Sequence, residues 1–316
     1  MLTLSRRGAL AALLAVPFAA PFAAPFAARA TGPLERITVA GWSKPITEVT
    51  PLLVEEDKGF YKAHGVDLRY VPGAGSADAI RNILGGRADV AFSDPGSFFA
   101  ALDKGETLRA IYDIYPQNVF NVVALQGSGI TKPADLKGKK IGVYSLASGT
   151  RQALQVLLHS AGLTEADVTV VVTGVLNFAP LMQGQVDATA ATDTGLLVGR
   201  RRGLPAVNVM EVGAVLPASS DLFVVREEVY QARRAALQRF LRGYRDAAAW
   251  MIAQPEEAAQ LAARRAIDGT DPALNLEIIR LRNAASVSAF TRRHGLGAID
   301  VAALQQAADG DCNLGL

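Results

Sequence analysis

The sequence GKKIGVYSLASGTRQAL, residues 138–154, has the order of elements that many proteins use to hold a phosphate group. A short apolar strand leads through a turn of small residues into a helix, whose free backbone N–H groups attract anions and polar ligand atoms. Phosphate-binding loops space their glycines as G-x-G-x-x-G or G-x-x-x-x-G-K-[ST]. Here Gly142 and Gly149 are seven residues apart, so the stretch predicts a helix start that binds a small polar group and not a nucleotide.

Motifs for catalysis are missing from the rest of the sequence. It contains no G-x-S-x-G and no H-E-x-x-H. The three histidines, His64, His159 and His294, fall late in expected helices, where a positive imidazole suits the helix dipole. The single cysteine, Cys312, allows no intramolecular disulfide. We therefore predict a protein that is not an enzyme and that uses no cofactor and no metal.

The elements that position the helix start alternate along the chain. Short β-branched runs are followed by segments of helical spacing, and this order predicts an α/β fold with two mostly parallel sheets and helices on both faces. Two segments echo each other: ILGGRADVAFSD at 83–94 and LMQGQVDATAATD at 181–193. Each places an aspartate three residues after a glycine and runs through a strand to a second aspartate. This pattern indicates a duplicated α/β unit.

The last third of the chain is helical in pattern and needs a sheet to pack on. A strand at 219–227 comes directly before it, so we expect the chain to return there to the first set of strands. The prediction is two lobes joined by two crossings, with the helical C-terminal segment packed on lobe one. Lobe one comprises 34–123 and 217–316, lobe two comprises 124–216, and the crossings lie near 124–128 and 212–218.

Two open sheets that face each other place the carboxyl ends of their parallel strands along one cleft, where ligands bind in this class of fold. The residues that follow the strands are therefore the candidate ligand contacts. They are mostly small and hydrogen-bonding, which suits a compact ligand enclosed on both sides. Lobe one contributes Trp42, Ser43, Lys44, Gly75, Ser76, Ser93, Asp94, Tyr115 and Asn118, and lobe two contributes Ser148, Gly149, Thr150 and Asp193.

Several of these candidates have a purely structural alternative. Ser76, Ser148, Asp94 and Asp193 can cap the helices that start beside them without touching a ligand. Trp42 can belong to the core and Lys44 can face water. Both interpretations remain open at the level of sequence.

The N-terminus predicts export from the cytoplasm. Residues 1–30 combine an arginine pair, an apolar run and an A-x-A-like end, which is the pattern of a cleaved signal peptide. Ser5-Arg6-Arg7-Gly8 resembles a twin-arginine motif. A retained membrane anchor is the alternative, but prolines at every fourth position of the PFAA repeat disfavour a spanning helix. Without residues 1–30 the chain has 29 basic and 30 acidic residues, so we expect no nucleic-acid partner.

Two stretches carry a family resemblance: VTPLLVEEDKGFYKAHGVDLRYVPG with SADAIRNILGGRADVAFSD, and DLKGKKIGVYSLASGTRQALQVLLHSAGL with PLMQGQVDA. They resemble the solute-binding proteins of ABC importers for nitrate, alkanesulfonates, taurine and thiamine-pyrimidine precursors. The resemblance implies a two-lobe periplasmic-binding-protein fold of type II and a monomeric, hinge-closing receptor. It also implies a periplasmic location and an ABC transporter permease as partner. By position, the family's ligand shell corresponds to the candidates named above, apart from Trp42 and Asn118.

The candidates also favour one class of ligand. Aromatic Trp42 and Tyr115 beside acidic Asp94 and Asp193 favour a planar ring with donor groups, such as a pyrimidine, over a sulfonate. A receptor of a TRAP-type transporter or of a sensor kinase is an alternative on the same fold. A synthase like the eukaryotic pyrimidine enzymes is a third possibility, although the single cysteine and the export signal argue against it.

Overall fold

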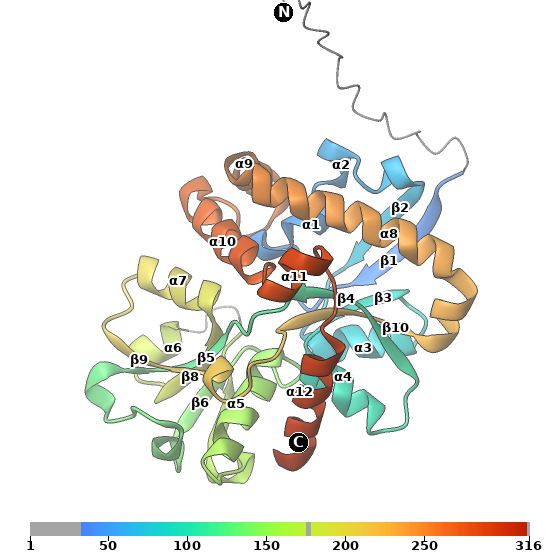
Figure 1. Cartoon of the computed structure of the whole chain (residues 1–316). Coiled ribbons are helices and arrows are strands. Elements are labelled where there is room, and N and C mark those ends of the chain that lie inside the picture. The colour runs from blue at the N-terminus through green and yellow to red at the C-terminus, as the bar shows by residue number, and fades with distance from the viewer. Residues whose placement is uncertain (1–32, 175–177, 315–316) are drawn as a thin grey trace, which may run out of the picture.

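The computed structural model describes residues 33–174 and 178–314, so the predicted signal peptide lies outside the described residues. The chain forms two five-stranded sheets, each in its own lobe (Figure 1). The first sheet has the order β2-β1-β3-β10-β4, with β1 (Glu35–Ala40), β2 (Val66–Val71), β3 (Val90–Ser93), β4 (Leu108–Tyr115) and β10 (Asp221–Arg226). The second has the order β7-β6-β8-β5-β9, with β5 (Phe120–Leu125), β6 (Lys140–Val143), β7 (Thr169–Val172), β8 (Ala188–Thr192) and β9 (Val207–Glu211).

Four strands of each sheet run in one direction and the fifth runs against them. The reversed strands are β10 in the first sheet and β5 in the second. Each is the first strand that the chain forms after passing from one sheet to the other. The two-lobe fold with mostly parallel sheets is therefore confirmed, and each reversed strand begins at the edge where its parallel neighbours end.

The chain changes sheets earlier than the sequence predicted. β4 ends at Tyr115 in the first sheet and β5 begins at Phe120 in the second, so the first passage is residues 116–119 and not 124–128. The apolar pattern of β5 does not indicate which sheet the strand joins, because a buried strand has the same residue pattern in either sheet. The second passage, 212–220, overlaps the predicted crossing at 212–218.

Helices cover both faces of each sheet. On the first sheet, α8 (Glu227–Ala253) contacts one face, and α3 (Ser76–Leu84) and α4 (Pro95–Leu102) contact the other (Figure 1). The period-two pattern of β1 explains this: Ile37 and Val39 face the α8 core, and Ala40 faces the α3 core. The second sheet packs against α5 (Gly149–Ser160) on one side and against α6 (Ala179–Met182) and α7 (Asp193–Arg201) on the other.

The echoed segments occupy equivalent places in the two lobes. Gly86 and Gly184 both have φ +69°, a left-handed conformation that glycine adopts without strain. The carboxylate of Asp89 then accepts from Thr38 N at 2.8 Å, and that of Asp187 accepts from Lys140 N at 2.8 Å. The same glycine and aspartate thus fasten equivalent strands, which supports the duplicated unit.

The C-terminal helices rest mainly on lobe one but also reach lobe two. They are α9 (Pro255–Arg265), α10 (Pro272–Ala285), α11 (Ala289–His294) and α12 (Val301–Leu314). α10 contacts α7, and α12 packs against both α4 and α5 (Figure 1). Over the described residues, no helix combines the length and apolar character that crossing a membrane requires.

Candidate functional site

A cavity of about 400 Å³ lies between the lobes. Trp42, Glu48 and Ser76 of lobe one line it together with Phe120, Tyr144, Ser148 and Phe178 of lobe two. Helices α7 and α10 also contribute, through residues such as Thr194, Ile278 and Arg282. A cleft of this size, with apolar walls and a few convergent polar groups, is the usual form of a small-molecule site.

Six of the thirteen residues predicted from sequence line this cavity: Trp42, Gly75, Ser76, Ser148, Gly149 and Thr150. The other seven, Ser43, Lys44, Ser93, Asp94, Tyr115, Asn118 and Asp193, do not. Residues that follow strands thus lie near the cleft, but their position in the sequence does not show which side chains line the cavity.

We define the helix-start side of the cavity as residues 74–77 and 145–150. Its two loops touch across the cleft, since Ala77 N donates to Ala147 O at 3.0 Å and Ser145 Oγ donates to Ala74 O at 2.5 Å. Gly75 has φ +135°, and a Cβ atom there would lie 2.3 Å from Ala147 O. Only glycine therefore fits at this contact between the lobes.

The serines on this side do not cap their helices as the sequence suggested. Gly75, and not Ser76, is the N-cap residue of α3, and the Ser76 hydroxyl instead accepts from Asp94 N at 3.0 Å. Ser148 is the N-cap residue of α5 but makes no side-chain cap bond. Its hydroxyl donates to Ser145 O at 2.6 Å and lies 2.8 Å from the Thr150 hydroxyl. Both hydroxyl-bearing residues remain at the wall of the cavity.

Asp94 is a helix cap. Its carboxylate accepts from Ser97 N at 2.7 Å and from the Ser97 hydroxyl at 2.9 Å at the start of α4. Burial raises the pKa of this carboxyl, and hydrogen bonds from Ser76 and Ser97 offset part of the effect. The Asp94 carboxylate is already bonded to Ser97 and lies outside the main cavity. Its role as a helix cap therefore accounts for its contacts.

The remaining candidates are held by local bonds. The hydroxyls of Ser43 and Ser93 each donate to the carbonyl of the next residue, and Lys44 is exposed. Asn118 lies in the first passage, where its amide donates to Leu216 O at 3.1 Å and accepts from Phe120 N at 3.0 Å. Asn118 therefore ties the two passages between the lobes together.

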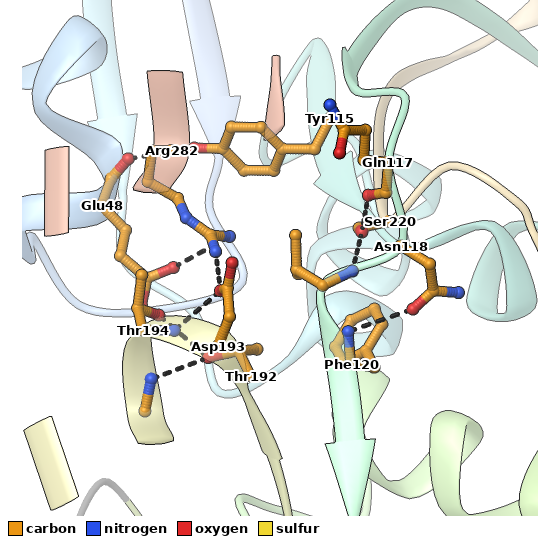
Figure 2. Close-up of polar contacts among 12 residues, drawn as sticks. Glu48, Tyr115, Gln117, Asn118, Phe120, Thr192, Asp193, Thr194, Ser220 and Arg282 are labelled. Carbon is orange, nitrogen blue, oxygen red and sulfur yellow. Dashed lines mark hydrogen bonds and ion pairs between the residues drawn. The ribbon is translucent and has the colours of Figure 1, made fainter. Parts of the chain in front are cut away.

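A second contact between the lobes crosses the cleft through charged groups, which we call the charged bridge: Glu48, Asp193 and Arg282 (Figure 2). Arg282, on α10, is 1% exposed, and its guanidinium pairs with Asp193 of α7 and lies 3.6 Å from the Glu48 carboxylate. The ring of Tyr115 stacks against the guanidinium at 5.0 Å. Thr194 completes the bridge by donating to Glu48 at 2.7 Å.

Asp193 therefore neither caps its helix nor lines the cavity. The N-cap of α7 is Thr192, whose hydroxyl accepts from Gly195 N at 3.1 Å. The Asp193 carboxylate accepts from Thr194 N at 2.7 Å and pairs with Arg282. The Asp94 and Asp193 carboxylates, on which the ligand argument relied, thus do not line the cavity, whereas Glu48, Asp221 and Asp268 do.

Sequence reasoning missed the residues that reach the cavity from unexpected elements. Asp221 begins the reversed strand β10, and searching only after strands overlooks the first residue of an antiparallel strand. Tyr144 directly follows β6, so the strand-end rule could have found it. Arg282 comes from a helix more than two hundred residues away from Glu48 in the sequence, and no local signal marks it.

The groups that most often perform acid–base or metal chemistry lie elsewhere. His64, His159 and His294 occupy the last turns of η2 (Lys62–His64), α5 and α11, as predicted, and none lines the cavity. Among the residues that the structure describes, no cluster of three or more histidine, cysteine, aspartate or glutamate side chains is arranged to hold a metal ion.

Comparison with known families matches residues 46–258, about two thirds of the chain, to the family described as NMT1/THI5 like. The chain belongs to this family. The fold is that of periplasmic binding proteins, and among the proteins that the chain resembles some are named as binding proteins and others as synthases.

Three relatives show the range of this family and fold. The riboflavin-binding protein RibY of Chloroflexus aurantiacus is 25% identical over 271 residues, which cover 84% of this chain and 77% of RibY. The 4-amino-5-hydroxymethyl-2-methylpyrimidine phosphate synthase of Aspergillus parasiticus is 25% identical over 66% of this chain and 64% of the synthase. The alkanesulfonate-binding protein SsuA of Xanthomonas axonopodis pv. citri, solved with MOPS, shares the fold, with a TM-score of 0.71, 18% identity and coverage of 90% and 95%.

Proposed function

We propose that this family member is an extracytoplasmic solute-binding protein that captures a small aromatic or heterocyclic molecule and delivers it to an ABC importer permease. The observation that carries the proposal is the cavity of about 400 Å³ whose wall is shared by both lobes. Trp42 comes from lobe one, and Phe120, Tyr144 and Phe178 come from lobe two. Aromatic side chains from both lobes in the wall of one cavity suit a planar ligand.

Capture requires that the lobes separate and close again. Residues 116–119 and 212–220 are the two passages about which they would rotate. A ligand that contacts both lobes stabilises the closed form through contacts that the open form lacks. The signal-like residues 1–30 and the binding proteins among the relatives support an extracytoplasmic location.

A thermal-shift screen of residues 31–316 tests the proposal. The panel contains riboflavin, pyrimidines, aromatic acids, alkanesulfonates and nitrate. A ligand at 100 times its dissociation constant adds about 2.7 kcal/mol to the free energy of unfolding, which raises the melting temperature by several degrees. The double variant Ser148→Ala, Thr150→Ala should weaken the response, whereas the control Ser160→Ala, at the far end of α5, should not. A flat response to every compound would overturn the proposal.

The synthase among the relatives supports a second candidate, an enzyme that acts on a pyrimidine. The two candidates differ in what happens to the bound compound. A binding protein returns it unchanged, whereas an enzyme converts it. Mass spectrometry of compounds recovered after prolonged incubation distinguishes the two, and purification of the protein with an ATP-driven permease would support the importer.

A further inference from the structure

The helix α12 spans the two lobes beside the passages that join them. It contacts α4 of lobe one and α5 of lobe two (Figure 1). Leu304, Ala307 and Ala308 pack on a core cluster of lobe one. Ala307 also lines a second cavity, of about 40 Å³, together with Asn118 and Leu216 of the two passages. Rotation of the lobes about these passages must therefore move α12 relative to at least one lobe.

The loop that leads into α12, residues 295–300, is fastened to Asp113 of β4. Asp113 N donates to Gly297 O at 3.0 Å. Gly297 has φ +84°, and a Cβ atom there would overlap the Tyr112 ring, so only glycine fits. The side chain of Asp113 makes a second link, because the Ser219 hydroxyl donates to its carboxyl group at 2.7 Å. Asp113 therefore connects the second passage to the loop that positions α12.

The carboxyl group in this connection is buried and only partly bonded. Asp113 is 3% exposed, and its Oδ1 atom has no hydrogen-bond partner among the residues that the structure describes. An unpaired polar atom in the interior is rare and calls for a specific explanation. Burial raises the pKa of Asp113 from 3.8 to about 7; the hydrogen bond from Ser219 offsets part of the rise, and the charge of Asp300 adds to it. Asp113 therefore changes its charge in the neutral pH range.

The neighbouring elements supply no cation for Asp113. Their titratable and charged groups are Asp300 before α12, Asp221 of β10, Asp94 at the start of α4, Tyr112 of β4, Arg245 of α8 and Arg292–His294 of α11. Arg245 lies 3.8 Å from the Asp246 carboxylate, and within the described part of the chain no basic group pairs with Asp113. An ionised Asp113 would thus face Asp300 with only the Ser219 hydroxyl bonded to it.

We propose that Asp113 is a pH-sensitive fastening for α12: the neutral acid keeps α12 seated on both lobes, and the carboxylate releases it and favours the open form. A buried charge without a counter-ion is costly, so the carboxylate moves toward water and leaves Ser219 and the loop at Gly297. The first turn of α12 then loses its position, because the Asp300 carboxylate that accepts from Ala303 N at 3.1 Å belongs to this loop. The inference rests on the lobe separation of the proposed function and adds a regulation to it.

A fluorophore on the single cysteine, Cys312, follows the motion of α12 in residues 31–316 without ligand. Between about pH 5 and pH 9, we expect the anisotropy of the wild type to fall with a midpoint near pH 7. The radius of gyration from small-angle X-ray scattering should rise over the same range. Asp113→Asn, which is neutral and of the same size, should keep the low-pH values throughout. His294→Gln is the control, because His294 is exposed beside the same loop and histidine titrates in this range; it should respond like the wild type.

Two further variants should move the midpoint in opposite directions. Ser219→Ala removes the hydrogen bond that lowers the pKa of Asp113, so the transition should shift to higher pH. Asp300→Asn removes the charge that raises this pKa but keeps a capping side chain, so the transition should shift to lower pH. Opposite shifts are not expected if either side chain has only a structural role.

Thermal unfolding gives an independent measure. The folded pKa of Asp113 lies above the unfolded value of 3.8, so its contribution to stability is full below 3.8 and is lost as the pH rises to about 7. Asp113→Asn avoids this loss. Its melting temperature should therefore lie several degrees above that of the wild type at pH 8, with a smaller difference at pH 5.

Three results would overturn the inference. Constant anisotropy of the wild type, or a transition that persists in Asp113→Asn, shows that Asp113 is not the switch. Unshifted midpoints in Ser219→Ala and Asp300→Asn show the same. A pH-dependent anisotropy with an unchanged radius of gyration shows that α12 moves without the lobes. Each of these results leaves ligand capture intact, whereas failure of every compound in the thermal-shift screen would refute the proposed function.

Discussion

The two contacts that join the lobes across the cavity are built from different chemistry. The helix-start side uses backbone carbonyls, an amide and a serine hydroxyl, all close to the chain segments that the sequence predicted. The charged bridge uses Glu48, Asp193 and a fully buried Arg282 brought in by the C-terminal helices. The first contact depends on backbone shape and the second on charge balance, so the two should respond to different mutations.

Arg282→Met should have the largest effect, because it leaves two carboxylates facing each other without their cation. Removing one partner of a buried ion pair costs about 3 kcal/mol of unfolding free energy. Urea unfolding measures the loss. The triple variant Arg282→Met, Glu48→Gln, Asp193→Asn removes the stranded charges and should recover most of it. Wild-type stability of Arg282→Met alone would show that the bridge contributes nothing.

Gly75→Ala tests the helix-start side. The new Cβ would lie 2.3 Å from Ala147 O at φ +135°, so the closed form should lose about 2 kcal/mol relative to the open form. Small-angle X-ray scattering should show a larger radius of gyration. Gly86→Ala is the matched control, since Gly86 also has a positive φ but nothing lies within 4 Å of its Cβ position. Identical scattering of Gly75→Ala and wild type would contradict the contact.

Asp94→Ala separates capping from ligand binding on the helix-start side. Loss of the bonds to Ser97 should cost about 1 kcal/mol of stability. Affinity for any compound found in the screen should stay within about 2-fold, because Asp94 does not line the cavity. A large loss of affinity with unchanged stability would show that Asp94 contributes to ligand binding and is not only a helix cap.

The sequence predicted the sheets and the helix-start side because their signals are local. A strand followed by small residues and a helix, as at 141–150, marks its own place at the sheet edge. The charged bridge had no such signal, since Arg282 looks like any arginine of an amphipathic helix until α10 packs against α7. Asp221 was missed for a geometric reason: a reversed strand presents its first residue, and not its last, at the cleft.

The smallest effect is expected from an ion pair just outside the helix-start side. Arg151, in the first turn of α5, pairs with Glu165 at 2.7 Å, and both side chains are partly exposed. The hydrogen bond from Arg151 lowers the pKa of Glu165, and the positive charge of Arg151 lowers it further. Ionised Glu165 therefore stabilises the folded state above the unfolded pKa of 4.5, and this contribution is lost as the pH falls through the lowered folded value.

Arg151→Gln should accordingly cost about 0.5 kcal/mol at pH 7, the scale of an exposed pair. The difference from wild type should be smaller at pH 3 than at pH 7, because protonation of Glu165 removes the charge that pairs with Arg151. Urea unfolding at the two pH values measures it, and 0.5 M salt should reduce the pH 7 difference because exposed charges are screened. A loss as large as that of Arg282→Met would remove the distinction between a solvated pair and the buried bridge.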